Sequence, residues 1–239
     1  CITTVFDHDR QTPARSHNPP MCNRYVAPDP AAIERHWQAR ASQPSVWAAS
    51  IPPRAPGPFI RAEGGARALG VGQWGLIPFF AKMAKLPYST NNVRSEELAA
   101  KPTFRDPWKR GQRCIIPAVS FDEPCWETGK NVWWRFRRVD GAPWGLAGLW
   151  NTWADKATGE LVESYTMLTL NADAHPLMRR MHKPEPDLLP DAQDKRSVIP
   201  IDADDVEQWL RGTVDEAQSL LRLAPVETFD AGPVSAASQ

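Results

Sequence analysis

The sequence has few cysteines and no long apolar run. Its four cysteines, Cys1, Cys22, Cys114 and Cys125, include no CxxC pair among 239 residues. This usage predicts neither a disulfide framework nor a zinc site, and it favours a reducing, cytoplasmic environment. No apolar stretch approaches the roughly 18 residues that a membrane helix requires, so no membrane partner is expected.

The motifs of several common enzyme classes are also missing. The glycine-rich stretch at 64–72, GGARALGVG, has neither the GxGxxG nor the GxxxxGK(S/T) spacing of phosphate-binding loops. No GxSxG nucleophile elbow is present. His175 and His182 are seven residues apart and have no acid nearby at metal-ligand spacing. We therefore expect neither a bound metal nor a cofactor.

Neither sign of charge dominates. Lys+Arg and Asp+Glu both number 28, so the formal net charge is zero at pH 7. This balance argues against a protein that coats nucleic acid by bulk charge, although it leaves room for a local basic groove. The chain is instead rich in proline and tryptophan, with 24 and 11 residues. The prolines predict many turns, and some tryptophans can stack on a ligand, although core packing is their commoner role.

The hydrophobic pattern places strands in the middle of the chain and helices at its ends. Helices are expected over 29–40, 202–212 and 214–223, with a short one over 95–104 that ends near Pro102. Strands are expected over 66–80, 112–124 and 164–173, and 131–153 is expected to form a hairpin around an Asp-Gly turn. Because strands and helices do not alternate, the predicted fold is a single α+β domain with a largely antiparallel, curved or barrel-like sheet flanked by helices.

A Met-Cys pair, Met21-Cys22, lies twenty residues inside the chain. Residues 1–20 are polar and lack the apolar core of a signal peptide, so we expect a disordered or non-native leader before one domain over 21–239. If translation starts at Met21 and this residue is removed, Cys22 acquires a free amine next to its thiol. The alternative is an ordinary internal cysteine.

Several polar residues stand at strand ends and turns. Asn92, Arg94 and Glu96 fall in STNNVRSEE, Glu123 follows an apolar strand, and His182 stands before a proline. Taken singly, each has a structural explanation as a turn former, a solvated charge, a strand-end acid or a helix cap. Only the set as a whole points to a shared function.

Six short motifs, in this order, resemble the SOS-response-associated peptidase-like (SRAP) family. They are MCNRY, WGLIP, TNNVRSE, the pair Phe104 and Trp108, RCIIPAVSFDE and HPLMRRMHKP. The resemblance runs from Met21 to about Leu210, and six motifs in sequence are specific although each alone is weak.

This sequence departs from the family pattern at several positions. Asn23 and Val93 replace a glycine and an alanine, and Pro124 replaces a tryptophan. Residues 184–195 read as an insertion before Arg196 resumes the motif.

The resemblance implies covalent capture of abasic sites in single-stranded DNA during the DNA-damage or SOS response. Cys22 would be the nucleophile: its amine, with a pKa of about 7.7–8.0, forms a Schiff base with the ring-opened sugar, and its thiolate closes a thiazolidine. Glu123 would transfer protons at the amine and the departing water. His182 would act as acid–base partner at the sugar oxygen, and Asn92 would hydrogen-bond the cysteine terminus or the sugar.

The resemblance also implies a set of DNA contacts. Arg94 would clamp a phosphate, with Arg24 as a second phosphate contact. Trp74, with Phe79, would stack on exposed bases. Asn171 stands where the family has an active-site threonine. A basic channel is expected from Lys82, Lys85, Arg110, Arg113, Arg179, Arg180 and Lys183.

Two alternatives remain open at this stage. One is an N-terminal-nucleophile peptidase or amidohydrolase that removes its own leader and exposes Cys22. The other is a non-covalent single-stranded DNA-binding module. In each case we expect a monomer. Single-stranded DNA is the expected partner for covalent capture and for the non-covalent binding module.

Overall fold

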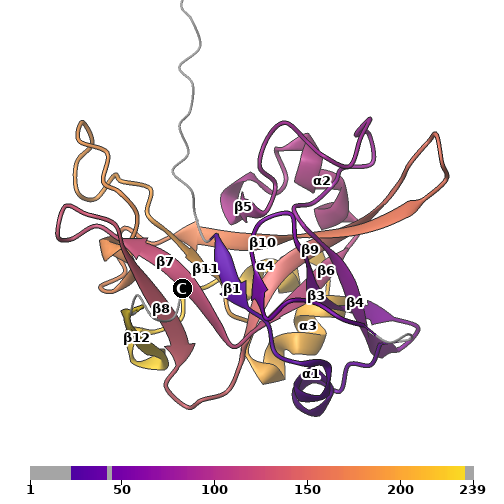
Figure 1. Ribbon diagram of the computed structural model, residues 1–239, viewed down its shortest axis with the longest axis horizontal. Helices are drawn as coiled ribbons and strands as arrows, with labels where there is room; N and C mark the ends of the chain where they lie inside the picture. Colours follow the sequence, from indigo (N-terminus) through magenta and orange to yellow (C-terminus); the bar gives the residue numbers. More distant parts are fainter. Residues whose placement is uncertain (1–22, 42–44, 235–239) are drawn as a thin grey trace, which may run out of the picture.

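The computed structural model describes residues 23–41 and 45–234. Two sheets form the body of the domain (Figure 1). The first sheet has, in order, β12 (Phe229–Pro233), β8 (Val132–Arg138), β7 (Ser120–Cys125), β1 (Arg24–Val26) and β2 (Ser50–Ile51). The expected leader and Cys22 lie outside the described residues.

Five strands of the second sheet pair in a ring, which makes a small barrel. In order they are β10 (Leu161–Asn171), β4 (Ala66–Trp74), β3 (Pro56–Glu63), β6 (Arg113–Ala118) and β9 (Trp144–Ala154), which pairs with β10 again. Two short strands, β5 (Asn92–Arg94) and β11 (Arg196–Val198), also pair with β10. Among the strands of the described residues, the pairings of β10 with β4 and β5 are parallel and the others are antiparallel. The predicted α+β fold with a largely antiparallel, barrel-like sheet is confirmed.

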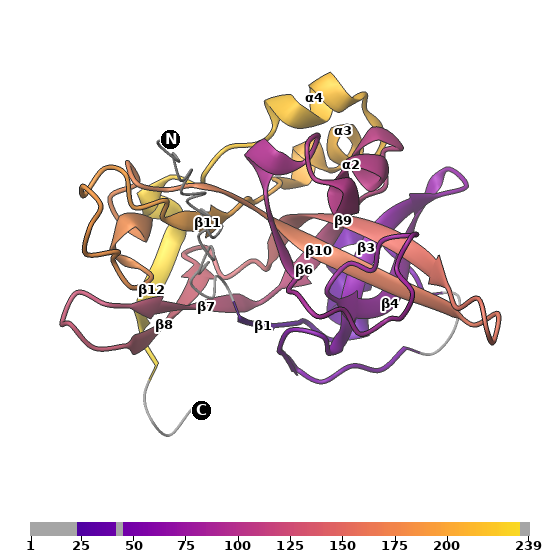
Figure 2. The ribbon, with the colours of Figure 1, turned by 90° about the horizontal axis from the view of Figure 1, so that it is seen from above.

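Four α-helices are present in the described residues: α1 (Pro30–Trp37), α2 (Pro102–Lys109), α3 (Val206–Arg211) and α4 (Val214–Ser219). Figure 2 shows α2, α3 and α4 together on one side of the barrel. Asp29 caps α1 by accepting a hydrogen bond from the Ala32 N–H at 2.8 Å. None of the helices in this part of the chain has the length and apolar character needed to cross a bilayer.

The hairpin expected over 131–153 is wrong, although both of its strands exist. β8 pairs with β7 and β12, whereas β9 pairs with β6 and β10, so the two strands belong to different sheets. The reason is burial: β9 is buried at nearly every position along its first half. A strand covered on both faces fits inside the barrel wall and not at the edge of a solvated hairpin.

The short helix expected over 95–104 is also wrong in its extent. Ser95–Glu97 forms a single 3₁₀ turn, and α2 begins at Pro102, where the expected helix was to end. Proline is favoured in the first turn of a helix because its missing N–H needs no intrahelical partner there. Pro102 therefore starts a helix here.

One apolar cluster joins the two sheets. Tyr25 and Phe121 of the first sheet pack with Phe59, Trp74 and Tyr165 of the barrel, all fully buried. The hydroxyl groups of Tyr25 and Tyr165 share a hydrogen bond of 2.6 Å, which connects the sheets at this point. The shared core holds β1 and β7 against the barrel wall.

Trp74 belongs to this core, which corrects its predicted role in stacking on DNA bases. Its side chain is 0% exposed, its ring lies edge-on to Tyr25, and its indole N–H donates to the Asn91 carbonyl at 2.8 Å. A ring with no exposed surface cannot stack on a base. Trp74 is a packing residue.

Trp74→Ala is therefore expected to lower the free energy of unfolding by about 3–5 kcal/mol, the usual cost of truncating a buried aromatic side chain. Urea unfolding followed by fluorescence measures this change. Any loss of DNA binding by the variant should follow the loss of folded protein. An unfolding free energy equal to that of the wild type would contradict the packing role.

Candidate functional site

A buried carboxylate and imidazole pair lies where β7 meets the turn after Met178–Arg180. Glu123 of β7 is 1% exposed and His182 is 4% exposed. His182 Nε2 and Glu123 Oε2 share a hydrogen bond of 2.9 Å. The structure thus brings together two of the predicted catalytic residues, which stand 59 positions apart in the sequence.

Backbone contacts hold His182 in this position. Its N–H donates to the Pro124 carbonyl at 2.6 Å, and Met181 forms a bridge with Cys125 at the end of β7. Its φ angle is 61°, a left-handed conformation that is uncommon outside glycine and is concentrated at functional sites. The imidazole is therefore placed by β7 itself, beside Glu123.

The competing histidine, His175, has a structural role. Its Nε2 lies 2.9 Å from the Ala224 carbonyl, and its Nδ1 accepts from the N–H groups of Leu177 and Met178. Both ring nitrogens are thus used within the fold. This leaves His182 as the histidine that contacts a buried carboxylate.

A second buried carboxylate, Asp122, lies beside Glu123 on β7 and binds two arginines. Arg24 of β1 donates to it from Nε at 2.8 Å, and Arg135 of β8 donates from Nε at 2.8 Å and from Nη2 at 3.0 Å. The hydrogen bond to Asp122 raises the pKa of Arg135. Arg24 is thereby anchored to the residue before Glu123 on β7, with its side chain 29% exposed.

A cluster of nitrogen-bearing side chains surrounds the carboxylate of Asp194. Arg94, on β5, forms an ion pair with it. Arg196 donates to it from Nη1 at 2.9 Å, and Asn171, at the end of β10, lies 3.5 Å from it through Nδ2. We call Arg94, Asn171 and Arg196 the Asp194 cluster. Asn92 lies two positions before Arg94 on the same short strand.

Lys195 connects the Asp194 cluster with the Glu123–His182 pair. Its Nζ donates to the His182 carbonyl at 2.7 Å, while its N–H donates to Asp173 at 2.8 Å. Burial lowers the pKa of the Lys195 amine, against the opposing effect of Asp173 and Glu185. The sequence places Asp194 and Lys195 in an apparent insertion and predicts no role for them, because nothing in their spacing indicates burial or contact with His182.

The apparent insertion at 184–195 forms the outer wall of a cavity of about 500 Å³ that reaches His182. Trp126 and Arg180 line the other side. Arg180 pairs with Glu127 at 2.6 Å and covers the ring of Trp134, while Lys183 Nζ lies 5.6 Å from the ring centre of Trp126. Aromatic and cationic groups are thus placed near the histidine.

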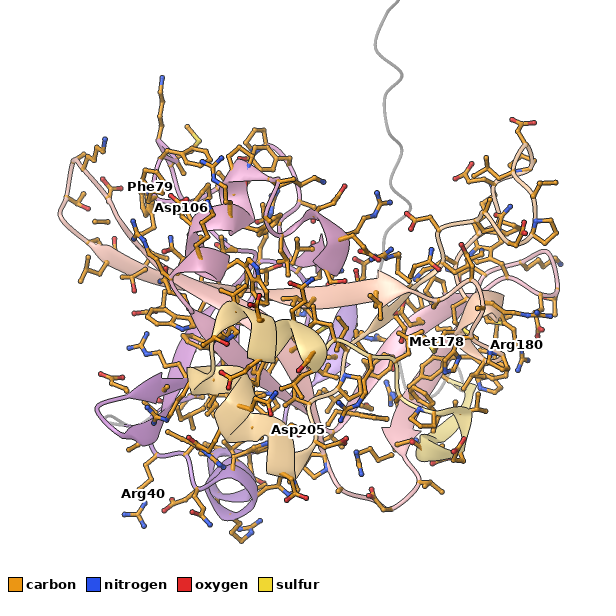
Figure 3. The ribbon with its side chains drawn as sticks, turned by 180° about the vertical axis from the view of Figure 1, so that it is seen from behind. Arg40, Phe79, Asp106, Met178, Arg180 and Asp205 are labelled. Carbon is orange, nitrogen blue, oxygen red and sulfur yellow. The ribbon has the colours of Figure 1, made fainter. Side chains whose placement is uncertain are left out.

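Two other predicted DNA contacts are placed elsewhere. Arg113 is buried and donates to the carbonyls of Trp209 and Gly212, so its assignment to a basic channel is wrong. Phe79 is 57% exposed, but Figure 3 shows it at the opposite end of the molecule from Arg180. It is too far from the cavity to stack on a base next to His182.

Metal ligands are not grouped in the described part of the chain. Within residues 23–41 and 45–234, no set of three or more His, Cys, Asp or Glu side chains is arranged to hold a metal ion.

The sequence profile of a protein family described as SOS response associated peptidase (SRAP) matches residues 21–238. Among curated proteins, the abasic site processing protein YobE of Bacillus subtilis is 33% identical over 164 residues, which cover 62% of this chain and 72% of the relative. The abasic site processing protein YoqW of the same organism is 32% identical over 176 residues, which cover 72% of each chain.

Among solved structures, the fold is similar to a crystal structure of a protein from Bordetella bronchiseptica. The TM-score is 0.79 at 36% identity, and the match covers 90% of this chain and all of the other. The barrel and the sheet that carries Glu123 therefore have a counterpart in a solved structure.

Proposed function

Since the chain belongs to the SOS response associated peptidase (SRAP) family, we propose that it processes abasic sites in single-stranded DNA by covalent capture through Cys22. Two relatives from Bacillus subtilis that are similar to this chain carry the name abasic site processing protein. The observation that carries the proposal is the buried Glu123–His182 pair, placed where the chain enters β1.

The register of the first sheet supports Cys22 as the nucleophile. Arg24 lies opposite Asp122 in the antiparallel pairing of β1 and β7. Asn23, the first described residue, therefore leaves β1 on the side of Glu123, the residue that follows Asp122. Cys22 directly precedes Asn23 in the sequence, although it lies outside the described residues. Chain connectivity thus links the proposed nucleophile to the strand beside the proton-transfer pair.

In the first step, the free amine of Cys22 attacks the aldehyde carbon of the ring-opened sugar. Glu123 takes a proton from the nitrogen and returns one to the departing hydroxyl, so that water leaves and a Schiff base forms. His182 acts at the sugar oxygen, where opening of the sugar ring requires a proton. The hydrogen bond between the two side chains allows them to exchange protons within a buried site.

In the second step, the thiolate of Cys22 adds to the same carbon and the nitrogen takes up a proton. A five-membered thiazolidine results, and the overall change is aldehyde plus cysteine to thiazolidine plus one water. Because the thiol and the amine belong to one residue, ring closure is intramolecular and has a high effective concentration. Only a cysteine at the N-terminus offers both groups to one carbon.

The phosphates of the captured DNA strand require cationic side chains near the Glu123–His182 pair. We assign Arg94 and Arg24 to them, because both are predicted phosphate contacts and both have partly exposed side chains. Asn92 precedes Arg94 on β5 and is assigned to the cysteine terminus or the sugar, and Asn171 to the DNA next to Arg94. Such contacts position the strand without reading its sequence.

Intact mass spectrometry of protein expressed from Met21 tests the proposal. We expect a mass that lacks Met21 and, after incubation with an abasic single-stranded oligonucleotide, a heat-stable species. Its mass should equal protein plus oligonucleotide minus one water. The same oligonucleotide without an abasic site is the control. An unchanged protein mass would refute covalent capture, and turnover of an amide substrate would support the peptidase hypothesis instead.

A further inference from the structure

The Asp194 cluster is a built anion site that is filled by a carboxylate of the same chain. Two guanidinium groups and one amide converge on the Asp194 oxygens, with Arg196 at 2.9 Å and Asn171 at 3.5 Å, and Arg94 in an ion pair. Guanidinium groups bind carboxylate and phosphate oxygens with similar geometry. A phosphodiester carries the same single negative charge as Asp194.

The backbones of the three donors are held by strand pairing, and each side chain has an acidic neighbour besides Asp194. Arg94 Nη1 lies 3.7 Å from Glu97, and Asn171 Nδ2 donates to Asp173 at 3.1 Å. The Arg196 side chain is 4% exposed, and its Nη2 also donates to Glu96 at 2.7 Å and to the Thr169 carbonyl at 2.9 Å. Arg94 lies on β5 and Asn171 at the end of β10. The donors are therefore fixed by β-strand pairing, whereas the anion is supplied by the segment that follows His182.

The part of that segment before Asp194 is braced within itself, whereas the N–H of Asp194 donates to Asp173 at 3.0 Å. Gln193 accepts from the Glu185 N–H at 2.7 Å and donates to the carbonyls of Glu185, Leu188 and Leu189 at 2.9–3.1 Å. Asp194 has a φ of 53°, a left-handed conformation that Asp and Asn tolerate better than most residues. A change of Asp194 to Asn therefore removes the charge while the loop keeps its shape.

We propose that Asp194 is an internal competitor for a DNA phosphate, and that it sets the affinity of this site for single-stranded DNA. The inference rests on the proposed function, because it takes Arg94 and Asn171 as DNA contacts. When DNA binds, a phosphate replaces the Asp194 carboxylate on Arg94 and Asn171. Arg196 stays bound to Glu96 and to the Thr169 carbonyl. The competing carboxylate lowers affinity and disfavours strands that cannot place a phosphate there.

Asp194→Asn is expected to bind an intact, fluorescently labelled single-stranded oligonucleotide roughly tenfold more tightly than the wild type at low salt. This gain is the size of one charge-assisted contact. The slope of log K against log salt concentration should stay close to that of the wild type, because the same number of phosphates is bound in both complexes. Fluorescence anisotropy over a salt series measures both quantities.

Asp191→Asn is the matched control, since Asp191 lies on the same segment, is exposed, and gives the same change in net charge. It should leave affinity and salt slope close to those of the wild type. In the Asp194→Asn background, Arg94→Gln should cancel most of the gain, which a double-mutant cycle quantifies. Equal gains for Asp191→Asn and Asp194→Asn, or no gain for Asp194→Asn, would overturn the inference.

The same proteins separate this inference from the proposed function. Covalent adduct formation with abasic oligonucleotide reports the function, and binding of intact oligonucleotide reports the anion site. If the adduct forms but Asp194→Asn gains no affinity for intact oligonucleotide, only the proposed role of Asp194 is refuted. If Asp194→Asn alone gains affinity but no adduct forms, covalent capture is refuted and the anion site is supported. Thermal unfolding of each variant shows that folded proteins are compared.

Discussion

Cys22→Ala is expected to abolish the covalent adduct with abasic single-stranded DNA, a loss from full conversion to the detection limit. The substitution removes the thiol, so a Schiff base can form but cannot close to a thiazolidine. Schiff bases hydrolyse readily, whereas the thiazolidine holds the sugar carbon through two bonds. Denaturing gel electrophoresis of the protein expressed from Met21 measures the remaining adduct.

Two further variants separate the contributions of the thiol and the amine. A chain that retains residues before Cys22 keeps the thiol, but its nitrogen is an amide and cannot form a Schiff base, so it should also give no adduct. Cys22→Ser keeps the amine and loses the thiolate, and it should likewise fail to give a stable product.

The two described cysteines cannot compensate for the loss of Cys22. Cys114 and Cys125 are both buried, and burial raises the pKa of the Cys114 thiol well above its usual value. Each of them also lacks an adjacent free amine, because its nitrogen is part of a peptide bond. A stable adduct formed by Cys22→Ala would therefore show that another residue is the nucleophile.

Glu123→Gln is expected to slow adduct formation by about 10²–10⁴-fold, the usual contribution of a positioned acid or base. The amide is similar in size to the carboxylate and can still hydrogen-bond to His182, but it cannot take up a proton at the reacting amine. Single-turnover kinetics with abasic oligonucleotide measures the rate. Binding of intact oligonucleotide should change little, because the Glu123 side chain is only 1% exposed.

Glu127→Gln is the matched control on the same stretch of chain. Glu127 is exposed, and its carboxylate pairs with Arg180, not with His182. Its replacement should leave the rate of adduct formation within a few-fold of the wild type. If both glutamine variants reacted as fast as the wild type, Glu123 would have no role in proton transfer.

The Glu123–His182 pair shows how much of the site the sequence predicts. Glu123 stands at the end of an apolar strand and His182 before Pro184, and neither position requires them to meet. The family resemblance grouped them, and the hydrogen bond of 2.9 Å confirms that they are neighbours. Their contact results from the Met181–Cys125 bridge, which attaches a distant turn to β7.

The wrong predictions for Trp74 and Arg113 share a physical cause, which is that the exposure of a side chain depends on tertiary packing. The family resemblance predicts Trp74 on the DNA-facing surface, yet it fills the core between the two sheets. Arg113 looked like a surface cation and instead donates to two buried carbonyls. No local pattern distinguishes an exposed ring or guanidinium from one whose partners come from distant segments.

The sequence by itself determined the class of fold, the cap and start of α1, the family, and the presence of the Met21-Cys22 pair. These depend on local periodicity, on short motifs and on their order. Only the tertiary structure decided that β8 and β9 belong to different sheets, and that Asp194 lies on Arg94. Such contacts join segments that are far apart in the chain, and they form only when burial of β9 and closure of the barrel bring those segments together.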